Sequence, residues 1–153
     1  MATKPTLKID GSFSDWIAPE RIDFGDIAGY SLYATVQSGL LYFDLNYTTA
    51  IGPNTTIWLN TDLNAATGYQ IFGNAGGAEY NVNIKADGTA ALYTGADGQT
   101  LVLDNIPIAY SADHTQVELA VPLSALSNPS NPIGVLTDAV SYTHLTLPTI
   151  CSV

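Results

Sequence analysis

Residues 56–84, TIWLNTDLNAATGYQIFGNAGGAEYNVNI, predict two strands joined by a loop rich in glycine and in oxygen-bearing side chains. Polar and apolar side chains alternate from Thr56 to Asn60, which is typical of a strand with one buried face. Gly68 can adopt the positive φ that turns the chain back, and Glu79 opens the returning strand. This stretch therefore favours strands connected by a long, polar loop.

The start of the loop predicts a cation site. Asn60, Asp62 and Asn64 occupy alternate positions, and side chains two apart on an extended chain point the same way. These three oxygens, together with the carboxylate of Glu79, can converge on one ion. Calcium accepts many hard oxygen ligands in loose geometry, so we expect a structural Ca²⁺ on these four residues. The alternative is an Asx-turn at Asp62 and Asn64, with Glu79 solvated.

Composition limits the class of protein. The chain has 153 residues, the length of one domain, and is 46% hydrophobic and only 12% charged. Four basic residues against fourteen acidic ones give a formal charge of −10, which argues against nucleic acid as a partner. Cys151 is the only cysteine, so no intrachain disulfide can form. The N-terminus lacks the apolar region of a signal peptide, and no apolar run is long enough to span a membrane, so we expect no membrane partner.

Short strands recur along the chain with few signs of helix. Tyr30–Gln37 and Leu40–Tyr47 alternate on either side of Ser38-Gly39, which predicts a hairpin. Further strands are expected at Leu7–Asp10, Ala90–Thr94, Leu101–Leu103, Ile106–Tyr110, Gln116–Val121 and Ile133–Leu136, and a helical turn at Pro122–Leu126. About eight to ten short strands predict a single all-β domain, an antiparallel β-sandwich of the jelly-roll or immunoglobulin-like type.

Four aromatic side chains fall on the polar face of their expected strands: Tyr33, Tyr42, Trp58 and Tyr93. Sugar recognition needs flat aromatic faces and a few planar polar groups. If the strands are neighbours, these four residues form a ligand-binding platform for a polysaccharide or glycan. The alternative is that a second sheet or a loop buries them. Trp16 is expected at one end of the core, with a ligand contact as its alternative.

The sequence does not predict catalysis. Apart from the C-terminal tail, His114 is the only histidine, which argues against a histidine-based triad or a multi-histidine metal site. The acidic residues sit mostly in turns, and Gly76-Gly77 lacks the lysine of a phosphate-binding loop. We therefore expect no enzyme activity and no catalytic residues.

A series of loose motifs occurs in a particular order along residues 7–138. They are Ile9-Asp10-Gly11 with Asp15-Trp16, Tyr30–Ala34 with Leu41-Tyr42-Phe43, Trp58–Asp62, Val117–Pro122 and Ile133-Gly134. This order resembles the family 9 carbohydrate-binding modules and the related DOMON-like β-sandwiches. The resemblance implies a non-catalytic carbohydrate-binding module, extracellular, and part of a larger secreted bacterial protein with other domains.

The loop at residues 60–79 is similar to a variant found in large secreted bacterial proteins, in which an Asp-Thr-Asp loop and a later acidic residue bind calcium. Here Asn60 replaces the first aspartate and removes one charge. The second hypothesis for function keeps this fold and its calcium but has no sugar site: a structural or adhesive spacer module.

The last residues, SYTHLTLPTICSV at 141–153, resemble translated sequencing adapter, which is found on truncated metagenomic reading frames. On this interpretation the module is residues 1–140, its closing strand is cut short, and residues 141–153 are a non-native tail. The alternative is a native edge strand, because Val140–Leu147 has acceptable β-propensity.

Overall fold

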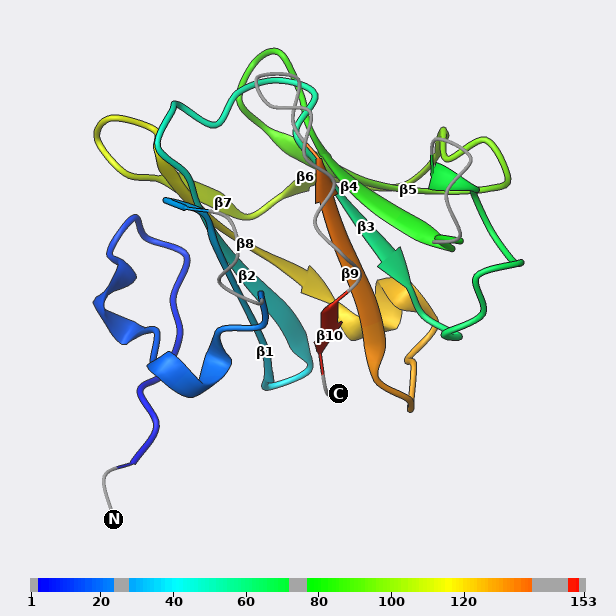
Figure 1. Cartoon of the computed structure of the whole chain (residues 1–153), viewed down its shortest axis with the longest axis horizontal. Coiled ribbons are helices and arrows are strands. Elements are labelled where there is room, and N and C mark those ends of the chain that lie inside the picture. The colour runs from blue at the N-terminus through cyan, green and yellow to red at the C-terminus, as the bar shows by residue number, and fades with distance from the viewer. Residues whose placement is uncertain (1–2, 24–27, 72–76, 139–148, 152–153) are drawn as a thin grey trace.

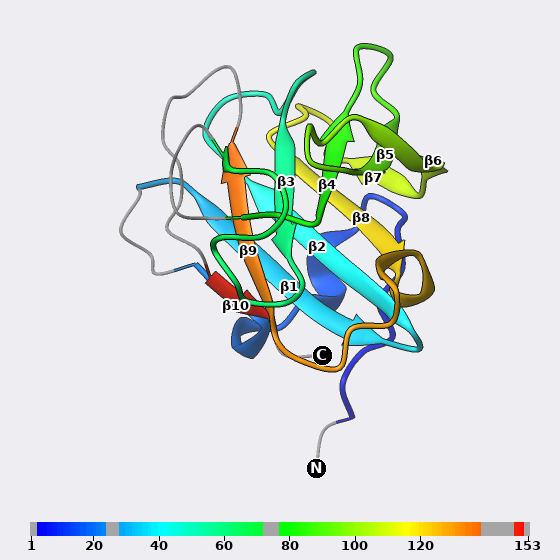
Figure 2. The same cartoon turned by 90° about the vertical axis from the view of Figure 1, so that its right-hand side faces the viewer.

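Two antiparallel sheets lie face to face and enclose the core (Figures 1 and 2). The computed structural model describes residues 3–23, 28–71, 77–138 and 149–151. The four-stranded sheet has the order β1-β2-β8-β7, and the six-stranded sheet has the order β10-β9-β3-β4-β5-β6. The all-β sandwich expected from the sequence is confirmed. No helix in these described ranges is long and apolar enough to cross a membrane.

The strands match the predicted ones closely. Their bounds are β1 Ser31–Gln37, β2 Leu40–Asn46, β3 Thr56–Asn60, β4 Tyr80–Ile84, β5 Ala90–Thr94, β6 Thr100–Ile106, β7 Ile108–Tyr110, β8 Gln116–Pro122, β9 Ile133–Asp138 and β10 Thr149–Cys151. Single 3₁₀ turns occur at η1 Phe13–Asp15, η2 Ala18–Glu20 and η4 Leu123–Leu126. The expected strand at Leu7–Asp10 is wrong, because the backbone N–H groups of Lys8 and Asp10 bond to the carboxylates of Asp15 and Glu118 instead of to a strand.

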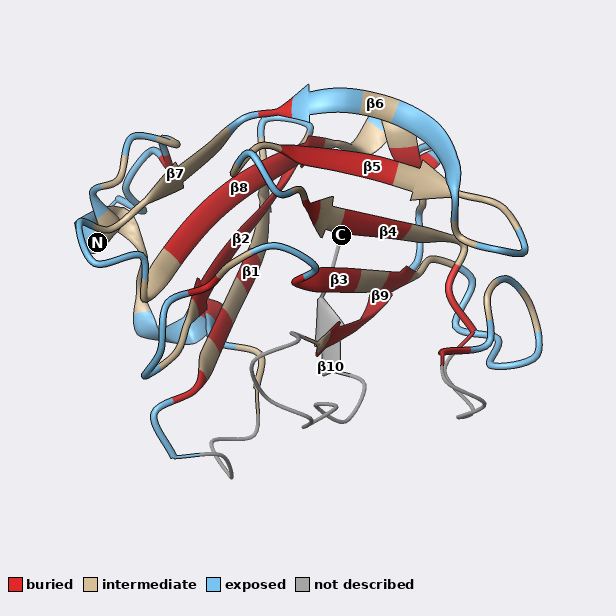
Figure 3. Cartoon of the chain, turned by 90° about the horizontal axis from the view of Figure 1, so that it is seen from above, coloured by how far each residue is buried: buried red, intermediate tan, exposed pale blue. Residues whose placement is uncertain are grey.

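The core forms from alternate residues of both sheets (Figure 3). On the six-stranded sheet Ile57 and Leu59 of β3 are buried, and on the facing sheet Leu41 and Phe43 of β2 are buried. Because side chains alternate along a strand, the residues between them must point away from the core. Each sheet therefore has an outer face whose residues are fixed by the packing of the inner one.

The N-terminal segment, residues 3–23, covers the outer face of the four-stranded sheet (Figure 1). Leu7 packs with Tyr42 and Ala120 in a small cluster of buried residues, and Trp16 borders it. The Trp16 ring meets Tyr33 edge to face, with centroids 6.1 Å apart. Trp16 thus packs on the outer face of the sheet. The prediction that it closes one end of the core is wrong.

A buried carboxylate holds this segment in place. Glu118 of β8 lies between the core residues Val117 and Leu119 and therefore faces away from the core, but it is completely buried. Its Oε1 accepts hydrogen bonds from the backbone N–H groups of Asp10 and Gly11, at 2.9 and 2.8 Å. Its Oε2 accepts from the indole N–H of Trp16 at 3.2 Å. Charge-assisted bonds of this kind compensate for the burial of the charge.

A second carboxylate, Asp44, lies directly opposite Glu118 on β2 and is also buried. Burial raises its pKa to about 7, and the negative charge of Glu118 adds to the shift, although hydrogen bonds from Gln116 oppose it. The Oδ1 of Asp15 is buried nearby without a partner among the described residues. Burial, with a smaller contribution from the neighbouring carboxylates of Glu118 and Asp15, thus favours the protonated form of Asp44.

We expect the free energy of unfolding to fall as pH rises from about 4 to about 7. The pKa of Asp44 is higher in the folded chain than in the unfolded one, so the folded state binds the extra proton in this window and loses it above. The loss is up to about 4 kcal/mol, at about 1.4 kcal/mol per pKa unit. Denaturant unfolding across pH should show that Asp44→Asn flattens this slope, whereas Asp104→Asn, an exposed acid, keeps it. Equal slopes in the wild type and Asp44→Asn would contradict the assignment.

The C-terminal strand β10 lies within the segment predicted to be a non-native tail. It pairs antiparallel with β9, with Thr149 opposite Val135 and Cys151 opposite Ile133. Residues 139–148 and 152–153 lie outside the described residues, and they include the edge strand considered as the alternative. The division at residue 140 and the origin of the tail stay predictions.

Candidate functional site

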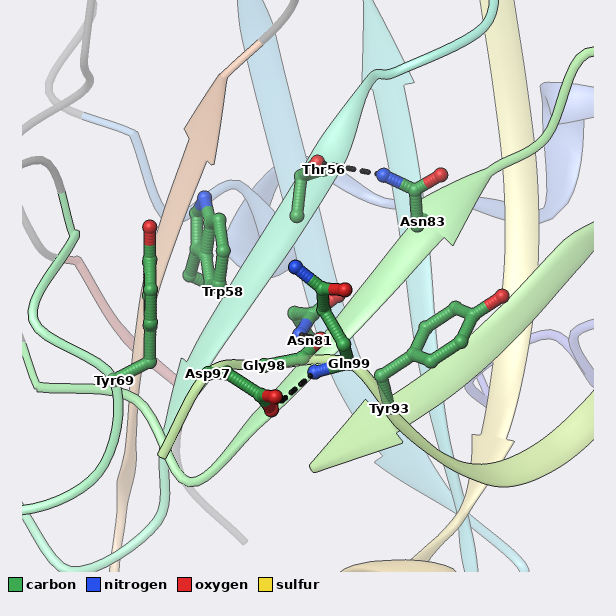
Figure 4. Close-up of a pocket in the computed structure, with 9 residues that line it drawn as sticks. All are labelled: Thr56, Trp58, Tyr69, Asn81, Asn83, Tyr93, Asp97, Gly98 and Gln99. Carbon is green, nitrogen blue, oxygen red and sulfur yellow. Dashed lines mark hydrogen bonds between the residues drawn. The ribbon is translucent and has the colours of Figure 1, made fainter. Parts of the chain in front are cut away.

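A pocket of about 420 Å³ opens on the outer face of the six-stranded sheet (Figure 4). It is lined by Thr56, Trp58, Tyr69, Asn81, Asn83, Tyr93, Asp97, Gly98 and Gln99. Its volume falls in the range of about 300–1,000 Å³ that is usual for small-molecule sites. The N-terminal segment covers the other outer face of the sandwich, so the two faces differ in what they offer to a ligand.

The strand register brings the pocket residues together. Trp58 of β3 lies directly opposite Asn81 of β4, which in turn lies opposite Tyr93 of β5. Thr56 and Asn83 form the next outward pair, and the amide of Asn83 donates to the Thr56 hydroxyl at 3.0 Å. These residues all alternate with core residues, so the same packing that buries the inner face turns them outward.

Trp58 is held on one face and at its edge. The ring of Tyr69 stacks on it with centroids 4.8 Å apart and an angle of 13° between the planes. Its indole N–H donates to Asp138 Oδ2 at 2.6 Å, and burial raises the pKa of Asp138. In Figure 4 the rings of Trp58 and Tyr69 stand on one side of the pocket and Tyr93 on the other. The remaining face of Trp58 is therefore turned toward the pocket.

The turn between β5 and β6 folds over the sheet and forms one wall. The carbonyl of Gly98 accepts a hydrogen bond from the side-chain amide of Asn81 at 2.9 Å, which ties the turn to β4. Gly98 has a φ of 67°, and a Cβ there would lie 3.1 Å from Asn81 Nδ2 and 3.5 Å from Trp58 Cζ3. Glycine is thus required both by the backbone conformation and by the close approach to the ring.

The polar groups of the pocket suit a neutral polyhydroxylated ligand. Asp97 and Gln99 lie exposed at its rim, and Asp97 Oδ1 is engaged by the backbone N–H of Gln99. Within the described part of the chain, the Gln99 amide and the Oδ1 of Asn83 have no hydrogen-bond partner. Planar amides beside aromatic rings can bond to hydroxyl groups while the rings pack against C–H surfaces.

The structure separates the four aromatic residues of the predicted platform. Trp58 and Tyr93 line the pocket, but Tyr33 and Tyr42 lie on the four-stranded sheet, on the opposite outer face of the sandwich. Tyr42 is buried by the N-terminal segment, and Tyr33 packs against Trp16. One platform of all four cannot form, because β1 and β2 are not neighbours of β3 and β5.

Sequence reasoning did not find the other pocket residues. Asn81 and Asn83 carried a usable signal, since they alternate with Val82 and Ile84 on the strand that returns beside Trp58. Thr56 alternates with Ile57 at the start of β3, and four further residues reach the pocket from loops that fold across the sheet: Tyr69, Asp97, Gly98 and Gln99. No local pattern in the sequence indicates where such loops turn.

Two of the four predicted calcium ligands, Asp62 and Glu79, and the backbone carbonyl of a third, Asn64, lie around the hydroxyl of Thr67. That hydroxyl is 2.7 Å from Asp62 Oδ2, 2.9 Å from the carbonyl of Asn64 and 3.0 Å from Glu79 Oε1. A hydroxyl has one hydrogen and can satisfy only one of these three acceptors at a time. Asp62 and Glu79 thus share one hydroxyl, and the Asn64 carbonyl accepts in addition from the backbone N–H of Thr67 at 3.2 Å; the calcium site itself stays a prediction. This donor set fits a hard cation.

The loop also contains the turns of the alternative interpretation. The N–H of Asn64 bonds to Asp62 Oδ1 at 2.8 Å, and the N–H of Ala66 bonds to Asn64 Oδ1 at 3.0 Å. Asn60 Oδ1 is buried with no partner among the described residues. Within the same residues no three acidic, histidine or cysteine groups gather as a metal site, so the oxygens beside Asp62 and Glu79 are neutral.

Comparison with protein-family models, with curated proteins and with solved structures found no match for this chain. The resemblance to carbohydrate-binding modules therefore stays a prediction from its motifs.

We expect Gly98→Ala to disturb the pocket and Gly39→Ala to leave it unchanged. Both glycines have positive φ, so each alanine should cost about 1–2 kcal/mol. Only at Gly98 does the new Cβ approach Asn81 and Trp58, since nothing lies within 4 Å at Gly39. Thermal unfolding measures the loss of stability expected in both variants. The indole N–H resonance of Trp58 in NMR spectra measures the displacement of the ring expected in Gly98→Ala alone. An unshifted resonance in Gly98→Ala would contradict the packing described.

Proposed function

We propose that this chain is a non-catalytic carbohydrate-binding module whose ligand site is the pocket on the six-stranded sheet. The observation that carries the proposal is the pairing of the aromatic rings of Trp58 and Tyr93 with the side-chain amides of Asn83 and Gln99 in one pocket. Aromatic faces supply apolar contact for the C–H surfaces of a sugar, and amides supply hydrogen bonds to its hydroxyl groups.

The pre-set geometry of the pocket supports binding further. Trp58 is fixed by its stack with Tyr69 and by its bond to Asp138, and Asn81 fixes the wall at Gly98. Side chains that are already ordered lose little entropy when a ligand arrives. In agreement with the motif resemblance, we propose that the module belongs to a larger secreted bacterial protein and acts outside the cell.

We also propose that the loop at residues 60–79 binds a structural Ca²⁺. Asp62 and Glu79 would supply the charged oxygens, with neutral oxygens from Asn64, Thr67 and Asn60. The cation would offset the mutual repulsion of the two carboxylates and tie the loop to the start of β4. A spacer module would have this calcium and lack the sugar site, so the two experiments below separate the hypotheses.

Affinity electrophoresis in gels that contain neutral soluble polysaccharides tests the sugar site. We expect retardation of the wild type by at least one polysaccharide, and we expect Trp58→Ala to weaken binding by about tenfold or more, since a lost aromatic face costs about 1.5 kcal/mol. Tyr33→Ala is the matched control, because it removes an aromatic ring from the opposite face. Equal loss in both variants would point to unfolding, and full binding by Trp58→Ala would refute the site.

Thermal unfolding in excess EGTA and then in millimolar calcium tests the cation. For a site with a Kd of about 10⁻⁴–10⁻³ M, 1 mM calcium should stabilise the fold by about 0.4–1.4 kcal/mol and raise the melting temperature by a few degrees. Asp62→Ala and Glu79→Ala should abolish the rise, and Asp104→Ala, an exposed acid far along the chain, should retain it. An unchanged melting temperature would exclude calcium binding at this affinity.

A further inference from the structure

Two buried carboxyl groups lie side by side on the face of the four-stranded sheet that the N-terminal segment covers. The register of β2 and β8 places Asp44 directly opposite Glu118, and residues directly opposite in a sheet point to the same face. Asp44 is 2% exposed and Glu118 is 0% exposed. Because the Cβ atoms of such a pair are about 4.5–5.5 Å apart, two negative charges there repel each other without the screening of water. The pair therefore favours one protonated carboxyl group.

No basic side chain neutralises this pair. The chain has four lysine and arginine residues, and three of them bind other acids at 2.6, 2.8 and 2.7 Å: Lys4 with Glu20, Arg21 with Asp23 and Lys85 with Asp104. The fourth, Lys8, is exposed. Three N–H groups donate to Glu118, which leaves Asp44 as the group that keeps the proton.

The other titratable groups on this face are tyrosines and acids. They come from every element packed around Asp44, and they are Tyr33 of β1, Tyr42 of β2, Glu118 of β8, and Asp10 and Asp15 of the N-terminal segment. The strand beyond β8 places only Ala109 opposite Glu118. A second negative charge on this face therefore meets acids and neutral groups, and only contact with water relieves it.

Residues 3–16 are attached to the sheet mainly by side chains. None of them belongs to a strand. The carboxylate of Glu118 accepts from the backbone N–H groups of Asp10 and Gly11, and the amide oxygen of Gln37 accepts from that of Leu7 at 2.8 Å. The apolar contact is the small cluster around Leu7. This part of the chain can thus leave the sheet without breaking a strand pair.

Residues 21 and 22 are attached in a different way, through the backbone. Arg21 forms an antiparallel bridge with Tyr33 of β1, and the N–H of Ile22 donates to the carbonyl of Leu32 at 2.8 Å. These bonds extend the ladder of the sheet and do not involve Glu118. If residues 3–16 leave, the segment stays anchored at its C-terminal end.

From these contacts we propose that the N-terminal segment is a pH-sensitive strap, in which residues 3–16 lie closed on the four-stranded sheet while Asp44 is protonated and open when it loses its proton. Opening brings water to both carboxylates, and it uncovers Tyr42 and Ala120 on the outer face of the sheet. The strap thus controls access to this second outer face. It does not depend on the proposed function of the pocket.

The pKa of Asp44 defines the pH range of the strap. In the closed form burial raises this pKa to about 7, with smaller contributions from Glu118 and Asp15, and in the open form it returns toward the ordinary value of 3.8. Between about pH 4 and about pH 7 the closed form holds a proton that the open form lacks. The ratio of open to closed chains should rise about tenfold per pH unit in this range and level off above it.

Amide hydrogen exchange of the full chain, followed by NMR from about pH 5 to about pH 8, tests the strap. We expect the protection factors of the Asp10 and Gly11 amides to fall about tenfold per pH unit up to about pH 7. They should be lower at every pH than that of Val82, because Val82 lies on a central strand and exchanges only on global unfolding. Ile22 should stay better protected than Asp10 and Gly11, since its bond to β1 persists.

Asp44→Asn removes the titrating group and should make the protection of Asp10 and Gly11 independent of pH. Asp104→Asn is the matched control, since Asp104 is an exposed acid and its removal should keep the slope. An equal slope in Asp44→Asn and the wild type would refute the role of the proton. Equal protection of Asp10, Gly11 and Val82 in the wild type would refute the strap itself, and this comparison decides even if Asp44→Asn does not fold.

Discussion

The hydrophobic core between the two sheets constrains every strand that reaches the pocket. Ile57 and Leu59 must be buried against the facing sheet, so Trp58 between them is turned outward. The same holds for Asn81 and Asn83 around Val82. A shift of one residue in register would exchange the two faces and place a tryptophan and two amides in the core. The alternation of buried and outward residues along these strands thus determines both the stability of the sandwich and the composition of its outer face.

The two outer faces of the sandwich differ in how far other segments cover them. On the four-stranded sheet, the N-terminal segment covers Tyr42 and is held by the buried carboxylate of Glu118. On the six-stranded sheet, loops at two sides leave the centre of the face open and lined by Trp58 and Tyr93. An aromatic residue at an outward strand position can therefore be buried under another segment or line an open pocket. Which of the two occurs depends on the path of the segment that covers the sheet.

This explains which features could be predicted from the sequence. Period-two alternation gave the strands and their facing, because it depends only on neighbouring residues. The platform of Tyr33, Tyr42, Trp58 and Tyr93 required knowledge of which strands are adjacent, which depends on contacts between distant parts of the chain. Two of the four residues reach the pocket. The turn at Gly98 and the stacking of Tyr69 were not predictable, because loops that cross a sheet follow its packing and leave no periodic trace.

The attachment of the β5–β6 turn separates the rim of the pocket from the packing of the sheet. Its tie to the sheet runs from the Asn81 amide to a backbone carbonyl at Gly98, so it does not depend on the side chains of the neighbouring positions. Asp97 and Gln99 project from this turn to the rim of the pocket and are exposed. Engineering can therefore exchange these two side chains and change the rim of the pocket, while the strands beneath keep the same packing. The turn can thus vary in its side chains while the sheet beneath it keeps one packing arrangement.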